Sequence, residues 1–134
     1  MDQVDVKIVE ILKKDSRTKN VQIAKEVSLT EGAVRNRIEK LVKNGIISKF
    51  TIESGTKGGV CAIVMVKAKD ETKKMMAEIS KLDLSKEAYE ISGDFDACAI
   101  VEASSLEELD EKIDKIRKIN SVLETKTYIS LKRY

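Results

Sequence analysis

Residues 18–50 constrain the fold more than any other stretch, because two short helical patterns follow one another with only a tight polar turn between them. The small Ala24 in the first pattern would let a second helix cross it closely. Thr30 directly precedes the second pattern and is predicted to be its N-cap, since its hydroxyl can accept a backbone N–H. The apolar side of the first helix is predicted to consist of Val21, Ile23, Ala24 and Val27. This pattern indicates a helix-turn-helix.

The second helix is predicted to run to Asn44 and to end at Gly45, which suits the left-handed position after a helix. Its apolar residues recur at i, i+4, i+7 and i+8, the spacing of one helical stripe. This stripe consists of Val34, Ile38, Leu41 and Val42.

The opposite side of the second helix carries Gly32, Asn36, Glu39 and Lys43, with Arg35 and Lys40 at its shoulders. Glycine inside a helix costs roughly 1 kcal/mol relative to alanine, so close approach of a DNA backbone would explain it. Arginine can read guanine and asparagine can read adenine, whereas lysines suit phosphates. The predicted DNA-binding residues are Lys25, Thr30, Gly32, Arg35, Asn36, Arg37, Lys40 and Lys43. The alternative is the solvated face of an ordinary helical hairpin.

The chain is predicted to have two domains joined by a connector. An opening helix with an apolar stripe completes a three-helix unit at 1–47. Residues 46–52 alternate apolar and polar, which predicts a half-exposed connecting strand, and 54–59 are Gly-rich and predict a turn or hinge. The connector between the two domains is therefore predicted to span 48–59. The stripe of the opening helix consists of Val4, Ile8, Ile11 and Leu12.

Residues 60–134 alternate between strand and helix patterns. Continuous apolar runs predict strands at 60–66 and 97–101, and further strands are expected at 88–92 and 122–131. Helices are predicted by the stripes Met75, Met76, Ile79, Leu82 and Leu106, Leu109, Ile113, Ile116. The order βαββαβ is that of a ferredoxin-like sandwich. Because both helices then cover one face of the sheet, the other face is expected to meet a partner chain.

Charge and composition narrow the function classes. Residues 1–50 hold 11 Lys and Arg against 7 Asp and Glu, a net charge of +4, whereas the remainder carries −2. This contrast favours nucleic acid as the partner of the first domain. No segment approaches the roughly 20 apolar residues of a membrane helix and no signal peptide is recognisable, so a cytoplasmic protein is expected. Cys61 and Cys98 are expected to be buried and reduced, and the absence of His argues against zinc.

Residues 89–96, Tyr-Glu-Ile-Ser-Gly-Asp-Phe-Asp, are the densest polar loop in the second domain. Gly93 can present backbone N–H groups to an anion while Asp94 or Asp96 accepts from an ammonium group, which together would suit a free amino acid. The alternative is a tight Gly-Asp turn between two antiparallel strands, with Tyr89 packing on a neighbouring strand.

The chain resembles the Lrp/AsnC, or feast/famine, transcription regulators over essentially its whole length. The motifs are 5–12 (DVKIVEIL), Ile23-Ala24, Leu29-Thr30, 34–41 (VRNRIEKL), 45–47 (GII) and 92–96 (SGDFD). Each is common, but their order and spacing are specific. Ser28 stands where the turn often has Gly, and Ser92 and Phe95 stand where Thr and Tyr are frequent.

The resemblance implies an α+β protein, a three-helix helix-turn-helix domain joined to a ferredoxin-like βαββαβ domain at 60–134. It also implies dimers formed through the sheets, assembling into tetramers or octamers, and amino acids that bind near the Gly-Asp loop and shift assembly or DNA affinity. The implied effector contacts are Tyr89, Ser92, Gly93, Asp94 and Asp96. No cofactor is expected beyond an amino-acid effector.

Two rival functions stay open at this point. An architectural, chromatin-like protein would coat duplex DNA with little sequence preference and without effector control. Haem-pathway decarboxylases resemble the same family, but that resemblance implies His residues at their sites, and this chain has none. We therefore expect a non-enzymatic, sequence-specific regulator whose partners are double-stranded DNA, further copies of the chain and a small amino acid.

Overall fold

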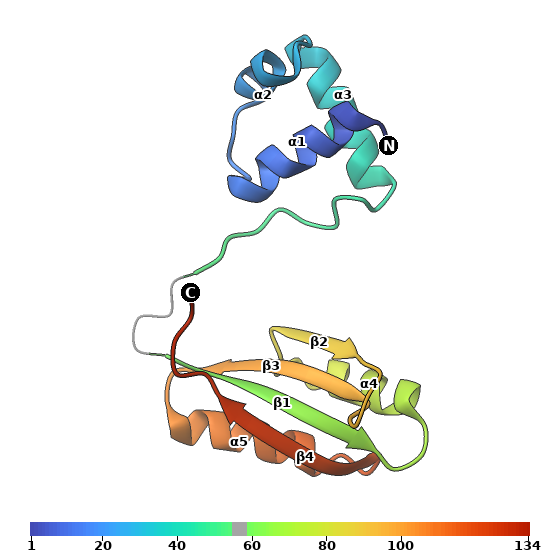
Figure 1. Ribbon diagram of the computed structural model, residues 1–134, viewed down its shortest axis with the longest axis vertical. Coiled ribbons are helices and arrows are strands. Elements are labelled where there is room, and N and C mark those ends of the chain that lie inside the picture. Colours follow the sequence, from blue (N-terminus) through green and yellow to red (C-terminus); the bar gives the residue numbers. More distant parts are fainter. Residues whose placement is uncertain (55–58) are drawn as a thin grey trace. The chain divides into compact units, whose positions relative to one another are not determined.

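The chain forms two compact units, Met1–Ser54 and Gly55–Tyr134, each of which is described by itself. The structure is a computed structural model that describes residues 1–54 and 59–134 (Figure 1). Most of the predicted Gly-rich hinge falls on 55–58, outside the described residues. In the described part, no helix is long and apolar enough to cross a membrane.

The first unit is the predicted three-helix arrangement: α1 (Gln3–Lys14), α2 (Asn20–Val27) and α3 (Glu31–Lys43). Its buried core consists of Ile8, Ile23, Ala24, Val34 and Leu41. Two residues assigned to the buried stripes are in fact half-exposed, Val21 at 53% and Val42 at 45%. The reason is size, because three short helices enclose only the centre of each stripe and leave its margins in water.

The turn between α2 and α3 has the geometry that the sequence predicts. The Thr30 hydroxyl accepts a hydrogen bond from the backbone N–H of Ala33 at 3.2 Å and caps α3. Ser28 adopts the left-handed conformation, with φ 57° and ψ 44°, where a glycine would be unstrained. α3 ends at Lys43, and Gly45 follows the C-cap with a φ of +72°, which allows the N–H of Ile46 to donate to the Leu41 carbonyl, as in a Schellman motif.

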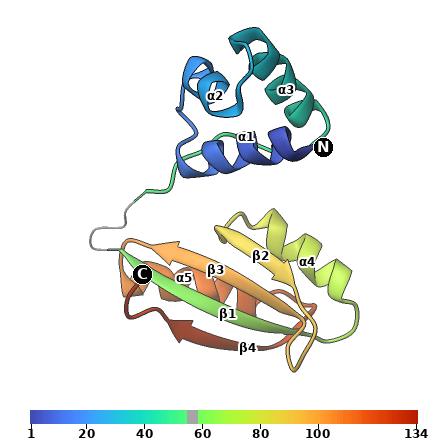
Figure 2. The same cartoon turned by 45° about the horizontal axis from the view of Figure 1, so that its top comes forward.

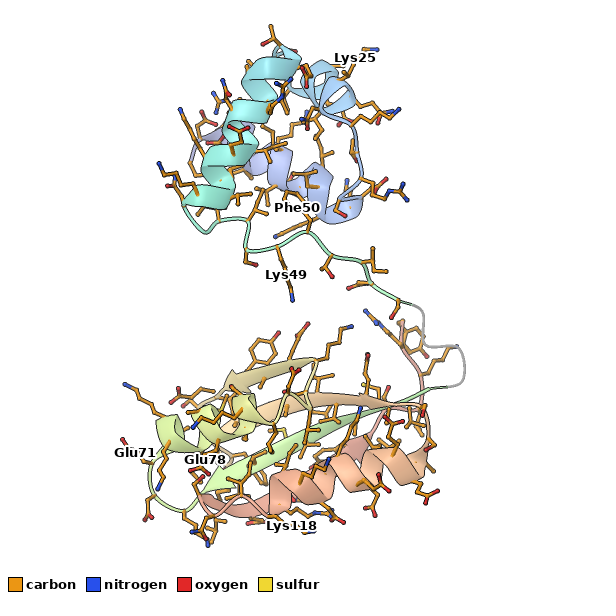
Figure 3. All side chains as sticks on the ribbon, turned by 180° about the vertical axis from the view of Figure 1, so that it is seen from behind. Lys25, Lys49, Phe50, Glu71, Glu78 and Lys118 are labelled. Carbon is orange, nitrogen blue, oxygen red and sulfur yellow. The ribbon has the colours of Figure 1, made fainter. Side chains whose placement is uncertain are left out.

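The predicted connecting strand at 46–52 is wrong. These residues are described and form no strand, because no neighbouring strand lies beside them to complete a hydrogen-bonded ladder. Phe50, expected to anchor the segment, lines a hollow of about 200 Å³ with Val9 and Leu12 of α1 but stays 53% exposed. Figure 3 shows Phe50 turned towards α1 and Lys49 pointing away.

The second unit has the predicted βαββαβ order. Its elements are β1 (Val60–Ala68), α4 (Thr72–Lys81), β2 (Glu87–Glu90), β3 (Ala97–Ala103), α5 (Leu106–Arg117) and β4 (Val122–Ile129). The sheet order is β2-β3-β1-β4 and every pair is antiparallel. Both helices lie on one face of the sheet (Figures 1 and 2). The fold is therefore the ferredoxin-like sandwich, with strand ends shifted by at most two residues from those predicted.

The two helices cover one face of the sheet and leave the other face open. The helix side of the sheet is buried and includes Ala62, Val64, Val66, Ala97, Ala99, Val101 and Val122. On the other face, Ile63 pairs in register with Ile100 and Tyr128, and it is 41% exposed. Cys61 and Cys98 alternate onto this open face as free thiols and are half-buried, not buried as expected. An apolar patch around Ile63 thus lies uncovered in the single chain.

Candidate nucleic-acid interface and effector loop

The outward face of α3 is polar and exposed along its whole length. The exposed members of the predicted set on this helix are Gly32, Arg35, Asn36, Lys40 and Lys43. They lie opposite the buried Val34 and Leu41, as the helical projection predicted. The helix therefore presents amide, guanidinium and ammonium groups on a side that the rest of its own unit leaves open, which is the geometry needed to enter a major groove.

Arg35, the predicted guanine reader, is not free in this structure. Its Nη2 donates to Oε1 and Oε2 of Glu31 at 2.7 and 2.6 Å, one helical turn towards the N-terminus. The hydrogen bond from Arg35 lowers the pKa of Glu31, whose carboxylate is thus charged at neutral pH. Both side chains are exposed, at 55% and 41%, so the pair is accessible to an incoming ligand.

Gly32 has no packing reason to be glycine. Within the described part of the chain, a Cβ built at Gly32 would meet no atom within 4 Å. Its φ is not positive either, so the backbone does not require glycine here. The space above Gly32 is thus available to something outside this chain.

Replacing Gly32 by alanine is expected to move stability and DNA binding in opposite directions. The helix should gain roughly 0.5–1 kcal/mol because alanine loses less backbone entropy. The added methyl group should weaken binding to duplex DNA if the backbone of the DNA approaches this point. Thermal unfolding and fluorescence anisotropy on the same preparation check both signs, with Ala33→Gly as the control that lowers stability. Tighter DNA binding by Gly32→Ala would contradict this reading of Gly32.

Arg37 does not join the outward face, because its guanidinium is paired within the unit, so its role as a DNA contact stays a prediction without support from this geometry. Its Nη1 donates to Asp2 at 2.7 Å and to Asp5 at 2.9 Å. These two carboxylates also close a capping box at the start of α1, where each accepts the backbone N–H of the other. The physical reason is direction, because Arg37 follows Asn36 by 100° of helical turn and faces α1. We assign Arg37 to holding α1 against α3.

Replacing Arg37 by glutamine is expected to lower the thermal stability of the protein at pH 7, and less so in acid. The bond from Arg37 lowers the pKa of Asp2 below its ordinary 3.8, so the pair contributes fully above that pH. The contribution is lost as pH falls through the depressed pKa. Thermal unfolding from pH 7 to 2.5 should therefore show the gap between the two proteins closing. A gap independent of pH, or one equalled by the exposed control Arg17→Gln, would contradict this assignment.

The remaining predicted DNA contacts divide into two kinds. Lys25 in the last turn of α2 is exposed and points away from the helices (Figure 3). Lys40 and Lys43 are exposed in the last turn of α3, and the role of all three lysines as phosphate contacts stays a prediction. Thr30 accepts a hydrogen bond in the cap of α3, and its role as a DNA contact stays a prediction.

The Gly-Asp loop connects β2 to β3 and is tied to the sheet at its base. Asp96 receives the N–H of Ala68 on its Oδ2 at 2.8 Å, at the irregular end of the β1–β4 pairing. The Asp96 backbone N–H donates to the Val66 carbonyl at 3.0 Å. Gly93 has φ +150°, which side chains disfavour, and Ser92 and Asp94 beside it are exposed. The tip is therefore open while the base is fixed.

Tyr89 stands apart from the loop tip. Its side chain alternates onto the open sheet face, opposite Cys98 of β3, and its hydroxyl donates to Glu87 on the same strand. That bond raises the pKa of the Tyr89 phenol. The structure thus brings Ser92, Gly93 and Asp94 together at the tip, sets Asp96 at the base and leaves Tyr89 on the sheet.

Two polar residues of the first unit were missed from the sequence as partners of the site. Glu31 holds Arg35, and the i,i+4 spacing of opposite charges on a helix was the available signal. Asp2 holds Arg37 across 35 positions of sequence, for which only the capping-box spacing with Asp5 gave a hint.

Comparisons with known proteins agree with both units. Residues 1–48 match a family model described as winged helix-turn-helix DNA-binding, and 61–134 match the Lrp/AsnC ligand binding domain. The HTH-type transcriptional regulator LysM of Sulfurisphaera tokodaii is 40% identical over 98% of this chain and 96% of that protein. The AsnC structure from E. coli superposes with a TM-score of 0.81 at 27% identity, covering 99% of this chain and 93% of that one.

A third comparison concerns the fold alone. The transcriptional regulator NMB0573 of Neisseria meningitidis, solved as a complex with L-Met, has a TM-score of 0.84 at 18% identity, over 98% of this chain and 90% of that one. The match of the second unit to the family's ligand-binding model and the near full-length relatedness to LysM lead to one conclusion. The chain belongs to the Lrp/AsnC family of DNA-binding transcriptional regulators.

Proposed function

We propose that two copies of this chain bind one pseudo-palindromic DNA site, each placing α3 in the major groove of one half-site. The observation that carries the proposal is the exposed polar face of α3, with Gly32 leaving room for close approach. Arg35 and Asn36 are assigned to base edges, because they lie in the first half of the helix. Lys25, Lys40 and Lys43 are assigned to phosphates. Residues 1–47 form the DNA-binding domain in this proposal.

The second unit, residues 60–134, is assigned to assembly and to effector binding. The open sheet face exposes Ile63, Tyr89 and Tyr128 at 41–53%, and a second copy of the same face would cover them. Dimers are the minimum assembly that gives two recognition helices, and further association into tetramers or octamers is part of the proposal. The protein would act in the cytoplasm and without catalysis.

The effector is proposed to be a free amino acid held at the tip of the Gly-Asp loop. Gly93 and its neighbours offer backbone N–H groups for a carboxylate, and Asp94 offers an acceptor for an ammonium group. The family's ligand-binding model over 61–134 and the L-Met complex of the Neisseria regulator support this class of ligand. Binding would shift the assembly or the DNA affinity by linkage, since the ligand favours the form that binds it better.

A thermal-shift screen of the twenty amino acids tests the effector. At 100 times its Kd, a ligand specific for the native assembly should stabilise it by about 2.7 kcal/mol. Asp94→Asn should lose that shift, whereas Glu107→Gln, an exposed carboxylate on α5, should keep it. Sedimentation velocity with the active amino acid then reports the change in assembly. The effector proposal fails if no amino acid produces a shift or a change in sedimentation.

DNA binding is tested separately with an operator duplex, by which we mean a duplex recovered by the protein from random sequence. Operator and scrambled duplexes are compared by fluorescence anisotropy at physiological salt. We expect the operator to bind about 10³-fold tighter or more. Equal affinities would favour an architectural protein that coats DNA.

A further inference from the structure

We propose that Glu31 sets the DNA specificity of this protein by holding the guanidinium of Arg35, which makes Glu31 a positioning residue that acts through Arg35. The inference rests on the proposed function of α3. It starts from the ion pair at 2.6 Å at the N-terminal end of the recognition helix, where base contacts are made.

The geometry of the pair leaves Arg35 able to bind a second partner. Both hydrogen bonds to Glu31 use Nη2, so Nε and Nη1 take no part in the pair. An arginine fork has five N–H donors in one plane, so fixing one nitrogen limits where the other donors can point. Glu31 therefore favours orientations of the guanidinium that keep Nη2 beside the carboxylate.

The charge of the pair matters as much as its geometry. Non-specific binding to DNA comes almost wholly from cations that neutralise phosphates. Arg35 paired with Glu31 offers no net charge to a phosphate, because the carboxylate stays beside it. A guanine edge needs donors in the right direction and no net charge. Glu31 thus reduces binding to arbitrary DNA more than binding to the operator.

The chain supplies a matched control on the same helix. Glu39 is also exposed on α3 and carries the same charge, but Arg35 makes its hydrogen bonds to Glu31, with Glu39 contributing only a weak electrostatic influence. Glu39→Gln and Glu31→Gln change the net charge of the helix equally. A difference between the two variants in the ratio of operator to scrambled affinity therefore measures the effect of the pairing between Glu31 and Arg35.

The experiment measures operator and scrambled-duplex affinities of the full chain from 50 to 300 mM salt. Glu31→Gln should bind scrambled DNA about two- to fivefold tighter at low salt. Its log K against log salt slope should become steeper by about 0.9, which corresponds to one further phosphate neutralised. The operator affinity of Glu31→Gln should equal that of wild type or fall below it, so the ratio of operator to scrambled affinity should fall. Glu39→Gln should change the ratio less.

A double-mutant cycle with Arg35→Ala separates positioning from simple charge. In the Arg35→Ala background, Glu31→Gln should leave the ratio of operator to scrambled affinity unchanged. This inference alone would be overturned if wild type and Glu31→Gln had the same ratio of operator to scrambled affinity and the same salt slope. It would also be overturned if Glu39→Gln changed that ratio as much as Glu31→Gln does, or if Glu31→Gln had its full effect in the Arg35→Ala background. Wild-type protein that binds no duplex at any salt would overturn the proposed function as well.

Discussion

Replacing Ile63 by glutamate is expected to convert the assembled protein to monomers and to weaken operator binding by about 10²–10⁴-fold. Ile63 lies at the centre of the open sheet face, between Ile100 of β3 and Tyr128 of β4. A carboxylate there would be buried without a partner in each of two facing copies, and like charges would meet across the two-fold axis. Loss of the dimer also removes the effective concentration that links two recognition helices on one DNA site.

Sedimentation velocity and anisotropy measure the two consequences of Ile63→Glu together. The matched control is Leu106→Glu on α5, which makes the same chemical change at a 62% exposed residue in the first turn of a helix. A negative charge in the first turn of a helix is favourable, and no interface is assigned to Leu106. We expect the control to remain assembled and to bind the operator as wild type does. A fully assembled Ile63→Glu protein would show that copies associate through another surface.

Replacing Arg35 by alanine is expected to cost roughly 1–3 kcal/mol of operator binding, which is about 5- to 150-fold in Kd. The loss should be confined to sequences that carry the preferred base at one position of each half-site. Operators substituted at that position should bind wild type and variant equally. Anisotropy titrations on the operator and its single-base variants measure both effects.

The variant Arg35→Lys distinguishes base reading from charge. Lysine keeps the positive charge but lacks the planar fork that fits a guanine edge. We therefore expect Arg35→Lys to lose the base preference while keeping the salt dependence of wild type. If Arg35→Lys kept the full preference for the operator, Arg35 would be a phosphate contact.

The sequence predicted the helices of the first unit because the residues that begin and end a helix act through local hydrogen bonds. Thr30 as N-cap and Gly45 as the terminating residue were both confirmed, since each depends on hydrogen bonds within one turn of the helix. The βαββαβ order was confirmed for a similar reason, as each apolar period is readable in a window of about ten residues. Periodicity does not report how far a stripe extends into the core, so Val21, Val42 and Leu106 were assigned wrongly.

Features that depend on distant partners were not predictable from one sequence. The alternation at 46–52 predicted a strand, but a strand also needs a neighbour, and none lies beside this segment in the described unit. Arg37 looked like its neighbour Arg35, yet Asp2 and Asp5 hold it on the other side of α3. Asp96 looked like a free ligand group, but its Oδ2 is bonded to the N–H of Ala68, 28 positions away.

Selection from random double-stranded DNA by the whole chain tests most directly whether α3 reads base edges in a duplex. We expect enrichment of a pseudo-palindrome whose half-sites lie about 10–10.5 bp apart, or a multiple of that distance. Recovered sequences that stay as diverse as the input at low ionic strength, where wild-type binding is strongest, would contradict it.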